Sequence, residues 1–319
     1  MKAAVVRDFD HTPAYGDFER PSPGADDVLI QVSAAALSNL VKAQAAGKHY
    51  SSPARAGFVP GVDGVGRMPD GQRVYFAFPK APFGAMAETT AVARSLCVPV
   101  PDELDDVTAA AAGNPGMSSW AALTERAGFV AGESVLINGA TGVSGRLAVQ
   151  IARHLGARRV VATGRNATSR ASLLALGADA HIALDQPADA LVSAFQDELN
   201  GGGIDVVLDY LWGPSGEQII RAVSKRGHES AARRVRFVQI GSVTSQTITL
   251  PGDALRSCGL ELLGSGIGSV PAERLVRAIG AMMKAIRPAH MTIDAEPIPL
   301  TNVESGWTLR TPKRVVFTI

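Results

Sequence analysis

The chain has 319 residues, of which 46% are hydrophobic and 19% charged, so it can bury more than one ordinary core. Lysine and arginine total 31 against 30 acidic residues, and the formal net charge of +1 argues against a dedicated nucleic-acid binder. No stretch approaches the roughly 18 unbroken apolar residues of a membrane-spanning helix, and charges follow the first residue too soon for a signal peptide. We therefore expect a two-domain cytoplasmic protein with no nucleic-acid or membrane partner.

The first hundred residues are punctuated by proline, with ten of the 19 prolines before position 102. Short β-branched runs lie between them at 3–6, 28–32, 73–78 and 89–100. Proline at this density excludes long helices and predicts a strand-and-turn domain of barrel type. One helical stretch interrupts it, around 39–46, and Gly47 closes that helix.

From about Ser118 short apolar strands alternate with helical patterns. The strands are expected at 135–137, 159–162, 182–184, 204–208, 235–240 and 260–263. The helices are expected around 147–155, from Pro187 to the glycines at 201–203, from Pro214 to Gly227, and over 271–286, before strand-like pieces that end at 315–319. Strands that alternate with helices predict a doubly wound parallel sheet.

A glycine-rich turn follows the first of these strands and opens a helix. It reads Ala140, Thr141, Gly142, Val143, Ser144, Gly145, which departs from the dinucleotide fingerprint by an alanine in the first glycine position. Small residues let the backbone approach a pyrophosphate, and the helix N-terminus offers free N–H groups and a positive dipole. The alternative is a tight turn that binds nothing, but strand, turn, helix and second strand occur in the order that a dinucleotide site requires.

The end of the second strand predicts which dinucleotide is used. An NAD site usually places Asp or Glu there, to hold the ribose hydroxyls. This strand ends in Gly164, Arg165 and Asn166, and no acidic residue occurs between Gly145 and Asp179. Because a carboxylate would repel a 2′-phosphate and an arginine could bind it, we expect NADPH as the cofactor. The alternative is that Arg165 merely faces solvent.

Seven short motifs resemble those of one family in their order and spacing. They are Gly-Lys-His-Tyr at 47–50, Pro-Gly-Val-Asp-Gly-Val-Gly at 60–66, Gly-Gln-Arg-Val at 71–74, Phe-Gly-Ala-Met-Ala-Glu at 83–88, Gly-Met-Ser-Ser-Trp at 116–120, the turn at 139–145 and Ile-Asp-Val-Val-Leu-Asp at 204–209. Together they resemble the medium-chain dehydrogenase/reductase superfamily and, within it, the zinc-independent quinone oxidoreductase-like family. The resemblance implies an α/β protein with a GroES-like β-barrel catalytic domain, made of 1–117 and 264–319, and a Rossmann NADPH-binding domain at 118–263. It also implies a homodimer.

Zinc-dependent members of the superfamily need clustered Cys, His and acidic ligands. Here Val62 and Asp63 stand where those relatives carry His and Glu, and Ser38 lies near the position of their first catalytic cysteine. The two cysteines, Cys97 and Cys258, are far apart in sequence. The histidines at 11, 49, 154, 181, 228 and 290 show no ligand spacing. We therefore expect no metal site.

The resemblance implies hydride transfer from NADPH to a quinone or similar conjugated carbonyl acceptor. Without a metal, the oxyanion that develops on the acceptor needs hydrogen-bond donors. Tyr50, in the family's tyrosine position, is the first candidate and Asn39 the second. The alternative for Tyr50 is a packed aromatic ring with its hydroxyl at the surface, and Lys48 and His49 are expected to be solvated rim residues.

The same resemblance assigns further positions to the cofactor. Ser118 is expected beside the nicotinamide, where its alternative is helix N-capping. Gly241 and Ser242 are expected near the ribose. Gly266 and Ile267 are expected where family backbone groups hold the carboxamide.

Three functions remain open. The first is an NADPH-dependent quinone reductase, and the second is an enone or enoyl double-bond reductase on the same scaffold. The third is an NADPH-binding sensor or scaffold protein without turnover, because fold alone does not establish catalysis.

Overall fold

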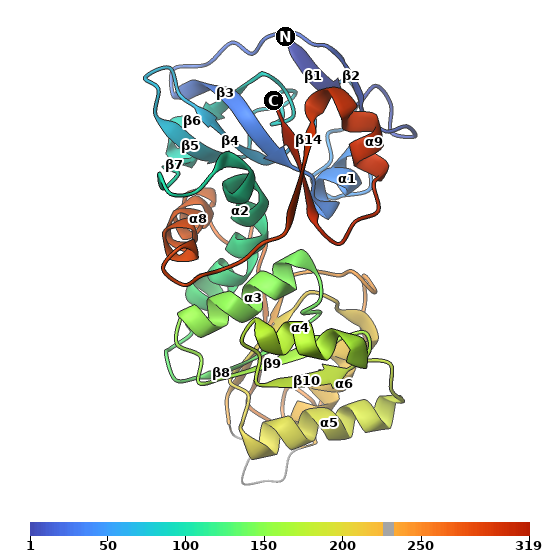
Figure 1. The fold of residues 1–319 in the computed structure, drawn as a ribbon. Helices are drawn as coiled ribbons and strands as arrows, with labels where there is room; N and C mark the ends of the chain where they lie inside the picture. Colours follow the sequence, from blue (N-terminus) through green and yellow to red (C-terminus); the bar gives the residue numbers. More distant parts are fainter. Residues whose placement is uncertain (226–232) are drawn as a thin grey trace. The chain divides into compact units, whose positions relative to one another are not determined.

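The computed structural model describes residues 1–225 and 233–319, so the expected helix stop at Gly227 and the histidine at 228 lie outside the described residues. The chain divides into two compact units (Figure 1). The first comprises Met1–Met117 and Ala272–Ile319, and the second Ser118–Pro271. The chain returns to the first unit where helix α8 (Ala272–Ile286) begins, whereas the sequence-based boundary is at 263/264.

The first unit contains mostly strands. In chain order its elements are β1 (Lys2–Val5), β2 (Ala14–Asp17), β3 (Asp27–Ala36), α1 (Asn39–Ala45), β4 (Asp63–Arg67), β5 (Arg73–Ala77), β6 (Thr89–Ala93), β7 (Cys97–Pro99), α2 (Asp106–Ala121, whose last four residues belong to the second unit), α8, β14 (Ala295–Pro299), α9 (Val303–Thr308) and β15 (Arg314–Thr318). Seven of these strands form one sheet in the order β14-β15-β3-β4-β5-β7, with β6 pairing β3, and β1 and β2 form a second, two-stranded sheet.

The expected strands and helix of this region are present, with small shifts of their ends. Strand β3 extends the apolar run at 28–32 at both ends, and its first eight residues alternate between buried and more exposed side chains, as a one-sided sheet requires. The run at 89–100 is two strands, β6 and β7, separated by the 3₁₀ turn Arg94–Leu96. Helix α1 ends before Gly47, whose φ of +66° lies in the left-handed region that favours glycine.

The second unit is the doubly wound parallel sheet that the alternating pattern predicts. Its elements are the π-helical turn Ala122–Ala127, β8 (Ser134–Asn138), α3 (Val143–His154), β9 (Arg159–Gly164), the 3₁₀ turn Ala167–Ser169, α4 (Arg170–Ala175), β10 (Ala180–Ala183), α5 (Ala188–Gly201), β11 (Val206–Asp209), α6 (Gly213–Ser224), β12 (Val235–Gln239) and β13 (Leu260–Gly264). The strand order is β10-β9-β8-β11-β12-β13, and every neighbouring pair is parallel. This order is that of a Rossmann dinucleotide-binding sheet, so the predicted α/β class is confirmed.

The strand order also locates the place where a ligand would bind. The chain moves outward in one direction from β8 to β10 and in the other from β11 to β13, so the switch point lies between β8 and β11. Right-handed crossovers then place α3 and α4 on one face of the sheet and α5 and α6 on the other. In open sheets of this kind, ligands bind at the carboxyl ends of the strands beside the switch point.

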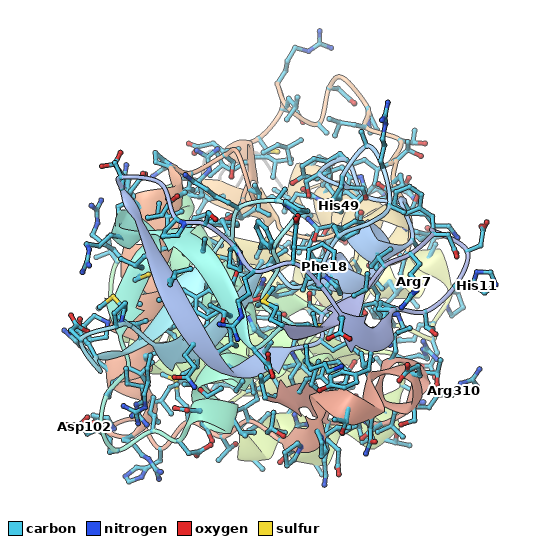
Figure 2. The ribbon with its side chains drawn as sticks, turned by 90° about the horizontal axis from the view of Figure 1, so that it is seen from above. Arg7, His11, Phe18, His49, Asp102 and Arg310 are labelled. Atoms are coloured by element: carbon cyan, nitrogen blue, oxygen red, sulfur yellow. The ribbon has the colours of Figure 1, made fainter. Side chains whose placement is uncertain are left out.

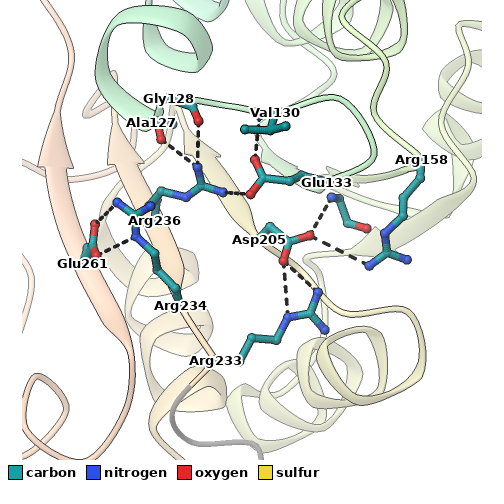
Figure 3. Close-up of polar contacts among 11 residues, drawn as sticks. Ala127, Gly128, Val130, Glu133, Arg158, Asp205, Arg233, Arg234, Arg236 and Glu261 are labelled. Carbon is teal, nitrogen blue, oxygen red and sulfur yellow. Dashed lines mark hydrogen bonds and ion pairs between the residues drawn. The ribbon is translucent and has the colours of Figure 1, made fainter.

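A network of charged side chains lies at the opposite, amino ends of these strands (Figure 3). Arg236, only 2% exposed, donates to the Ala127 carbonyl at 2.7 Å and to Glu133. Asp205 accepts from the Ser134 amide at 2.8 Å and from the Arg233 guanidinium at 2.7 Å. The network connects β8, β11 and β12, so it stabilises the sheet that carries the site at its other end.

Candidate functional site

The predicted turn has the backbone geometry of a phosphate-binding loop. Gly139 adopts a φ of +92°, which only glycine adopts readily. A Cβ on Gly145 would collide with the Gly139 carbonyl oxygen and would lie 2.6 Å from the Ala140 Cα, so helix and turn pack at a distance that only glycine allows. Gly142 is the N-cap of α3 and provides no side-chain cap.

Because of this missing cap, the first amides of α3 are available to a ligand. Ala140 is buried, Thr141 and Gly142 are exposed, and Val143 and Ser144 are half-buried. Close backbone approach and uncapped N–H groups at a helix N-terminus are what a pyrophosphate requires. The residues of this unit therefore fit a dinucleotide.

A buried polar network beneath the turn holds it in place. Thr163 Oγ1 accepts from the Gly139 amide at 2.9 Å and donates to Asn138 Oδ1 at 2.8 Å. Asn138 Nδ2 in turn donates to Asp209 Oδ1 at 2.8 Å and to Ser215 Oγ at 2.9 Å. The network spans β8, β9 and β11, and the contact between Asn138 and Asp209 lies at the switch point. Sequence reasoning missed these residues, although Thr163, Asn138 and Asp209 are polar side chains at or near the ends of apolar strands.

Other predicted cofactor positions also lie at the carboxyl ends of strands in this unit. Gly241 follows β12, its amide donates to the Asp209 carbonyl at 3.1 Å, and Ser242 after it is half-buried. Gly266 follows β13, and its amide donates to Ser269 Oγ at 2.7 Å. The next residue, half-buried Ile267, forms a bridge with Val270.

Gly164, at the end of β9, is closely surrounded by protein atoms. A Cβ there would collide with Ser169 Oγ and would lie 2.8 Å from His181 Nε2 and 3.0 Å from Thr141 Cγ2, so the space beside Gly164 is filled by the protein itself. Arg165 is exposed.

Asn166 shapes the loop that follows. It caps the turn Ala167–Ser169, with its Oδ1 accepting from the Thr168 amide at 3.2 Å.

Ser118 also belongs to the second unit. It lies inside α2, so the alternative that it caps a helix N-terminus is wrong. Its Oγ is 3.2 Å from the Tyr210 hydroxyl, which brings it to the residue that follows β11. Burial raises the pKa of Tyr210 to about 12, so its phenol stays protonated. Sequence reasoning did not single out Tyr210.

The two predicted catalytic residues lie at the start of α1 and in the loop after it, in the first unit. Asn39 is exposed at the first position of the helix, whose N-cap is Ser38. Tyr50 follows the helix and is 78% exposed. Its ring packs on the His49 ring with centroids 4.1 Å apart, and His49 is labelled in Figure 2.

His49 belongs to a hydrogen-bonded chain that sequence reasoning missed. Gln44 Nε2 donates to Ser51 Oγ at 2.9 Å, and Ser51 Oγ lies 2.7 Å from His49 Nδ1. The Ser51 amide also donates to His49 Nδ1, at 3.2 Å. Since Nδ1 accepts from an amide, the ring is a neutral imidazole with its proton on Nε2, and burial lowers the pKa of His49 in the same sense.

Gln44 and Ser51 line a pocket within the first unit. Most of its wall is apolar, including Phe58, Val62 and Phe83. An apolar pocket with a few polar groups suits a planar organic molecule that carries an oxygen. The sequence gives little indication of this pocket, because Gln44 and Ser51 come together only through the conformation of the loop after α1.

A buried charged cluster lies in the same unit. Tyr75 donates its hydroxyl proton to Asp63 Oδ2, and the guanidinium of Arg314 is buried near both. Burial raises the pKa of Asp63 to about 6, and this effect outweighs the opposing hydrogen bond from Tyr75. By the sequence resemblance, Asp63 stands where zinc-dependent relatives carry a glutamate. In this structure its carboxyl accepts a hydrogen bond from Tyr75.

Neither a metal cluster nor a membrane span occurs in the described part of the chain. Within residues 1–225 and 233–319, no group of three or more His, Cys, Asp or Glu side chains is placed to hold a metal ion. None of the helices in the same ranges is long and apolar enough to cross a membrane.

Comparisons with known proteins agree with this architecture. Residues 144–282 match the family model of the zinc-binding dehydrogenases. The chain is 26% identical to a probable NADPH-dependent quinone reductase of Emericella nidulans, over 96% of each chain. It is 32% identical to the 2-methylene-furan-3-one reductase of Solanum lycopersicum over 65% of this chain, and it spans 55% of that relative's length.

The fold is also that of a solved reductase. The quinone oxidoreductase of Thermus thermophilus, which was also solved in complex with NADPH, superposes with a TM-score of 0.79 at 24% identity over the whole of both chains. The turn, the strand order and these likenesses point to the same family. Together they support the medium-chain dehydrogenase/reductase superfamily, within which the chain is similar to the quinone oxidoreductases.

Proposed function

We propose that this oxidoreductase transfers hydride from NADPH to a quinone or a similar conjugated carbonyl acceptor, and that it does so without zinc. The observation that carries the proposal is the N-terminus of α3, which has no side-chain cap and follows the turn Gly139–Gly145. The backbone geometry of this turn requires glycine at Gly139 and Gly145. Thr163 and Asn138 hold the turn in position. The probable NADPH-dependent quinone reductase from Emericella nidulans, which matches over nearly its whole length, supports the same cofactor.

Residues of the second unit would hold the cofactor. The amides of Val143, Ser144 and Gly145 would bind the pyrophosphate, because α3 leaves them uncapped. Arg165 would bind the 2′-phosphate through its planar donors, next to Gly164 and Asn166. When bound, NADPH supplies the hydride.

The remaining predicted positions would orient the other end of the dinucleotide. Gly241 and Ser242 would lie near the ribose, and Gly266 and Ile267 near the carboxamide. Ser118 would lie beside the nicotinamide, oriented by the Tyr210 hydroxyl 3.2 Å away.

The first unit would bind the acceptor. Phe58, Val62 and Phe83 provide an apolar wall, which suits a quinone ring. Tyr50 and Asn39 are proposed as hydrogen-bond donors to the acceptor oxygen. Such donors would stabilise the developing oxyanion in place of a metal.

An enone reductase is the second candidate. The 2-methylene-furan-3-one reductase of Solanum lycopersicum is named for a conjugated ketone, and the chain covers about half of it. Quinones and enones differ in shape rather than in the polarity of the accepting carbonyl. The pocket beside Gln44 and Ser51 favours either reductase over a non-catalytic NADPH sensor, because a sensor needs no acceptor pocket.

The proposal also covers the functional domains, the cellular location and the oligomeric state. The split catalytic domain of 1–117 and 264–319 and the cofactor domain of 118–263 are proposed as functional domains. A cytoplasmic location is proposed from the composition of the sequence, and a homodimer from the family resemblance.

The test is a screen of NADPH oxidation, followed by absorbance, across quinones, enals, enones and enoyl thioesters. The protein is first dialysed against a strong chelator and its zinc content measured. We expect oxidation with quinones or enones by zinc-free protein. Turnover that disappears with the metal and returns with zinc would contradict the zinc-free mechanism, and no turnover with any acceptor would support the sensor.

A further inference from the structure

Two polar side chains, Ser169 and His181, lie next to Gly164 at the end of β9. Ser169 Oγ is 3.0 Å from His181 Nε2, and both atoms lie within 3 Å of the place that a Cβ on Gly164 would take. Thr141 Cγ2, from the phosphate-binding turn, is 3.0 Å from the same place. Ser169 and His181 therefore pack against Gly164, the residue before Arg165, where Thr141 of the turn is also close.

The hydrogen bonds define how the imidazole is held. Ser169 Oγ donates to the Asn166 carbonyl at 3.0 Å, which uses its single proton. The bond to His181 must then be donated by the imidazole N–H at Nε2. Because this bond persists when the ring takes a second proton at Nδ1, His181 can gain a charge without leaving its place.

The charges around His181 come from the elements packed against it. Burial is the largest cause that lowers the pKa of His181; Arg170, the first residue of α4, lowers it further, while Asp185 beyond the end of β10 raises it. Arg165 and Arg170 are exposed, and His181 is half-buried in the edge strand β10. The ring is thus neutral near pH 7, lies near Arg170, and packs against Gly164, the residue before Arg165, so an anion bound there would favour its protonation.

We propose that His181, positioned by Ser169, is a specificity-determining residue that makes the preference for a 2′-phosphorylated dinucleotide depend on pH. This rests on the proposed use of NADPH. A 2′-phosphate bound by Arg165 brings negative charge to this corner, the imidazole takes up a proton, and the dinucleotide binds more tightly as the pH falls. A dinucleotide without the 2′-phosphate does not bind more tightly as the pH falls.

The experiment measures equilibrium dissociation constants of NADP⁺ and NAD⁺ by calorimetry between about pH 5.5 and 8.5, a range that brackets the ordinary histidine pKa. These oxidised forms are used because they survive mild acid. The full-length protein is compared with His181→Gln, which keeps a hydrogen-bond donor for Ser169 but cannot titrate. Comparing the two proteins at each pH cancels the titration of the phosphate itself. Ser169→Ala is the second variant, which keeps the titrating ring but removes the hydroxyl that positions it.

For NADP⁺, we expect the dissociation constant of His181→Gln to exceed that of the unmutated protein by about tenfold at the acid end of this range and to approach it at the alkaline end. For NAD⁺ the two proteins should agree throughout. Ser169→Ala should show part of the loss at acid pH. A ratio for NADP⁺ that stays constant with pH, or an equal change for NAD⁺, overturns the role of His181. Equal binding of NADP⁺ and NAD⁺ by the unmutated protein at every pH overturns the proposed cofactor instead.

Discussion

At the scale of single residues, the sequence predicts well where backbone geometry demands one residue type. Gly139, Gly142 and Gly145 are identifiable because a turn that approaches phosphate tolerates little else, and the structure gives a steric reason for the first and the last. The bond between Ser51 and His49 could not be predicted in this way. It depends on how the loop after Gly47 folds back, and no spacing rule describes that loop.

The residues around the pocket give the first prediction at this scale. Ser51→Ala should raise the KM for the acceptor roughly fivefold while the dissociation constant of NADPH stays unchanged, because it removes about 1 kcal/mol of hydrogen bonding on the pocket wall. Tyr50→Phe is the matched comparison, since it also removes one hydroxyl. Tyr50→Phe should act on turnover, by less than the roughly 2.7–4 kcal/mol of an enclosed oxyanion donor, because the ring is 78% exposed. Steady-state kinetics with one acceptor separates the two, and unchanged constants in both variants would contradict both roles.

Asp63 gives a prediction about pH. Its folded pKa of about 6 lies above the ordinary value of 3.8, because burial disfavours the carboxylate. A carboxyl whose pKa is raised by folding stabilises the folded state at pH values below its pKa in the unfolded chain. This stabilisation is lost as the pH rises through about 6. The loss amounts to roughly 3 kcal/mol over the whole titration, most of it between about pH 4 and 7. Urea unfolding across this range should therefore show a component that declines with pH and that Asp63→Asn removes. Identical pH slopes in the two proteins would contradict it.

At the scale of elements, hydrophobic periodicity predicts those helices that have one buried face. Helix α3 is found this way, since Leu147 and Ile151 are buried against the sheet and Arg146 is not. Helix α2 was missed, because its alanine-rich sequence is buried on several sides and carries Pro115, and neither feature gives a helical period. The β6 and β7 strands were merged because the three residues between them carry no glycine or proline.

The network at the amino ends of the strands gives a prediction about elements. Arg236→Ala should lower the free energy of unfolding by about 3–5 kcal/mol, because it leaves Glu133 and two backbone carbonyls without their buried partner. Arg234→Ala is the control in the same strand region, since its ion pair with Glu261 is exposed to solvent and should change the free energy of unfolding much less. Chemical denaturation of both variants provides the comparison. Equal losses would mean that burial does not distinguish the two arginines.

At the scale of the whole molecule, the alternation of strands and helices is enough to predict the Rossmann unit as a doubly wound parallel sheet. The return of the chain is harder to place. Residues 264–271 have no strong period, and the prediction used the last apolar strand as the boundary, whereas the chain joins the first unit at α8. How the seven-stranded sheet of the first unit is ordered also depends on pairings between β3 and β15, which are far apart in sequence.

The most direct test of the account is the ratio of kcat/KM for NADPH to that for NADH, measured with one accepted quinone or enone. Arg165 and the absence of a carboxylate at the end of β9 should favour NADPH by about tenfold or more. In Arg165→Ala the value for NADPH should fall while that for NADH stays nearly constant, and added salt should reproduce part of this loss in the unmutated protein. Equal values for the two cofactors in the unmutated protein, or a preference for NADH, would contradict the account.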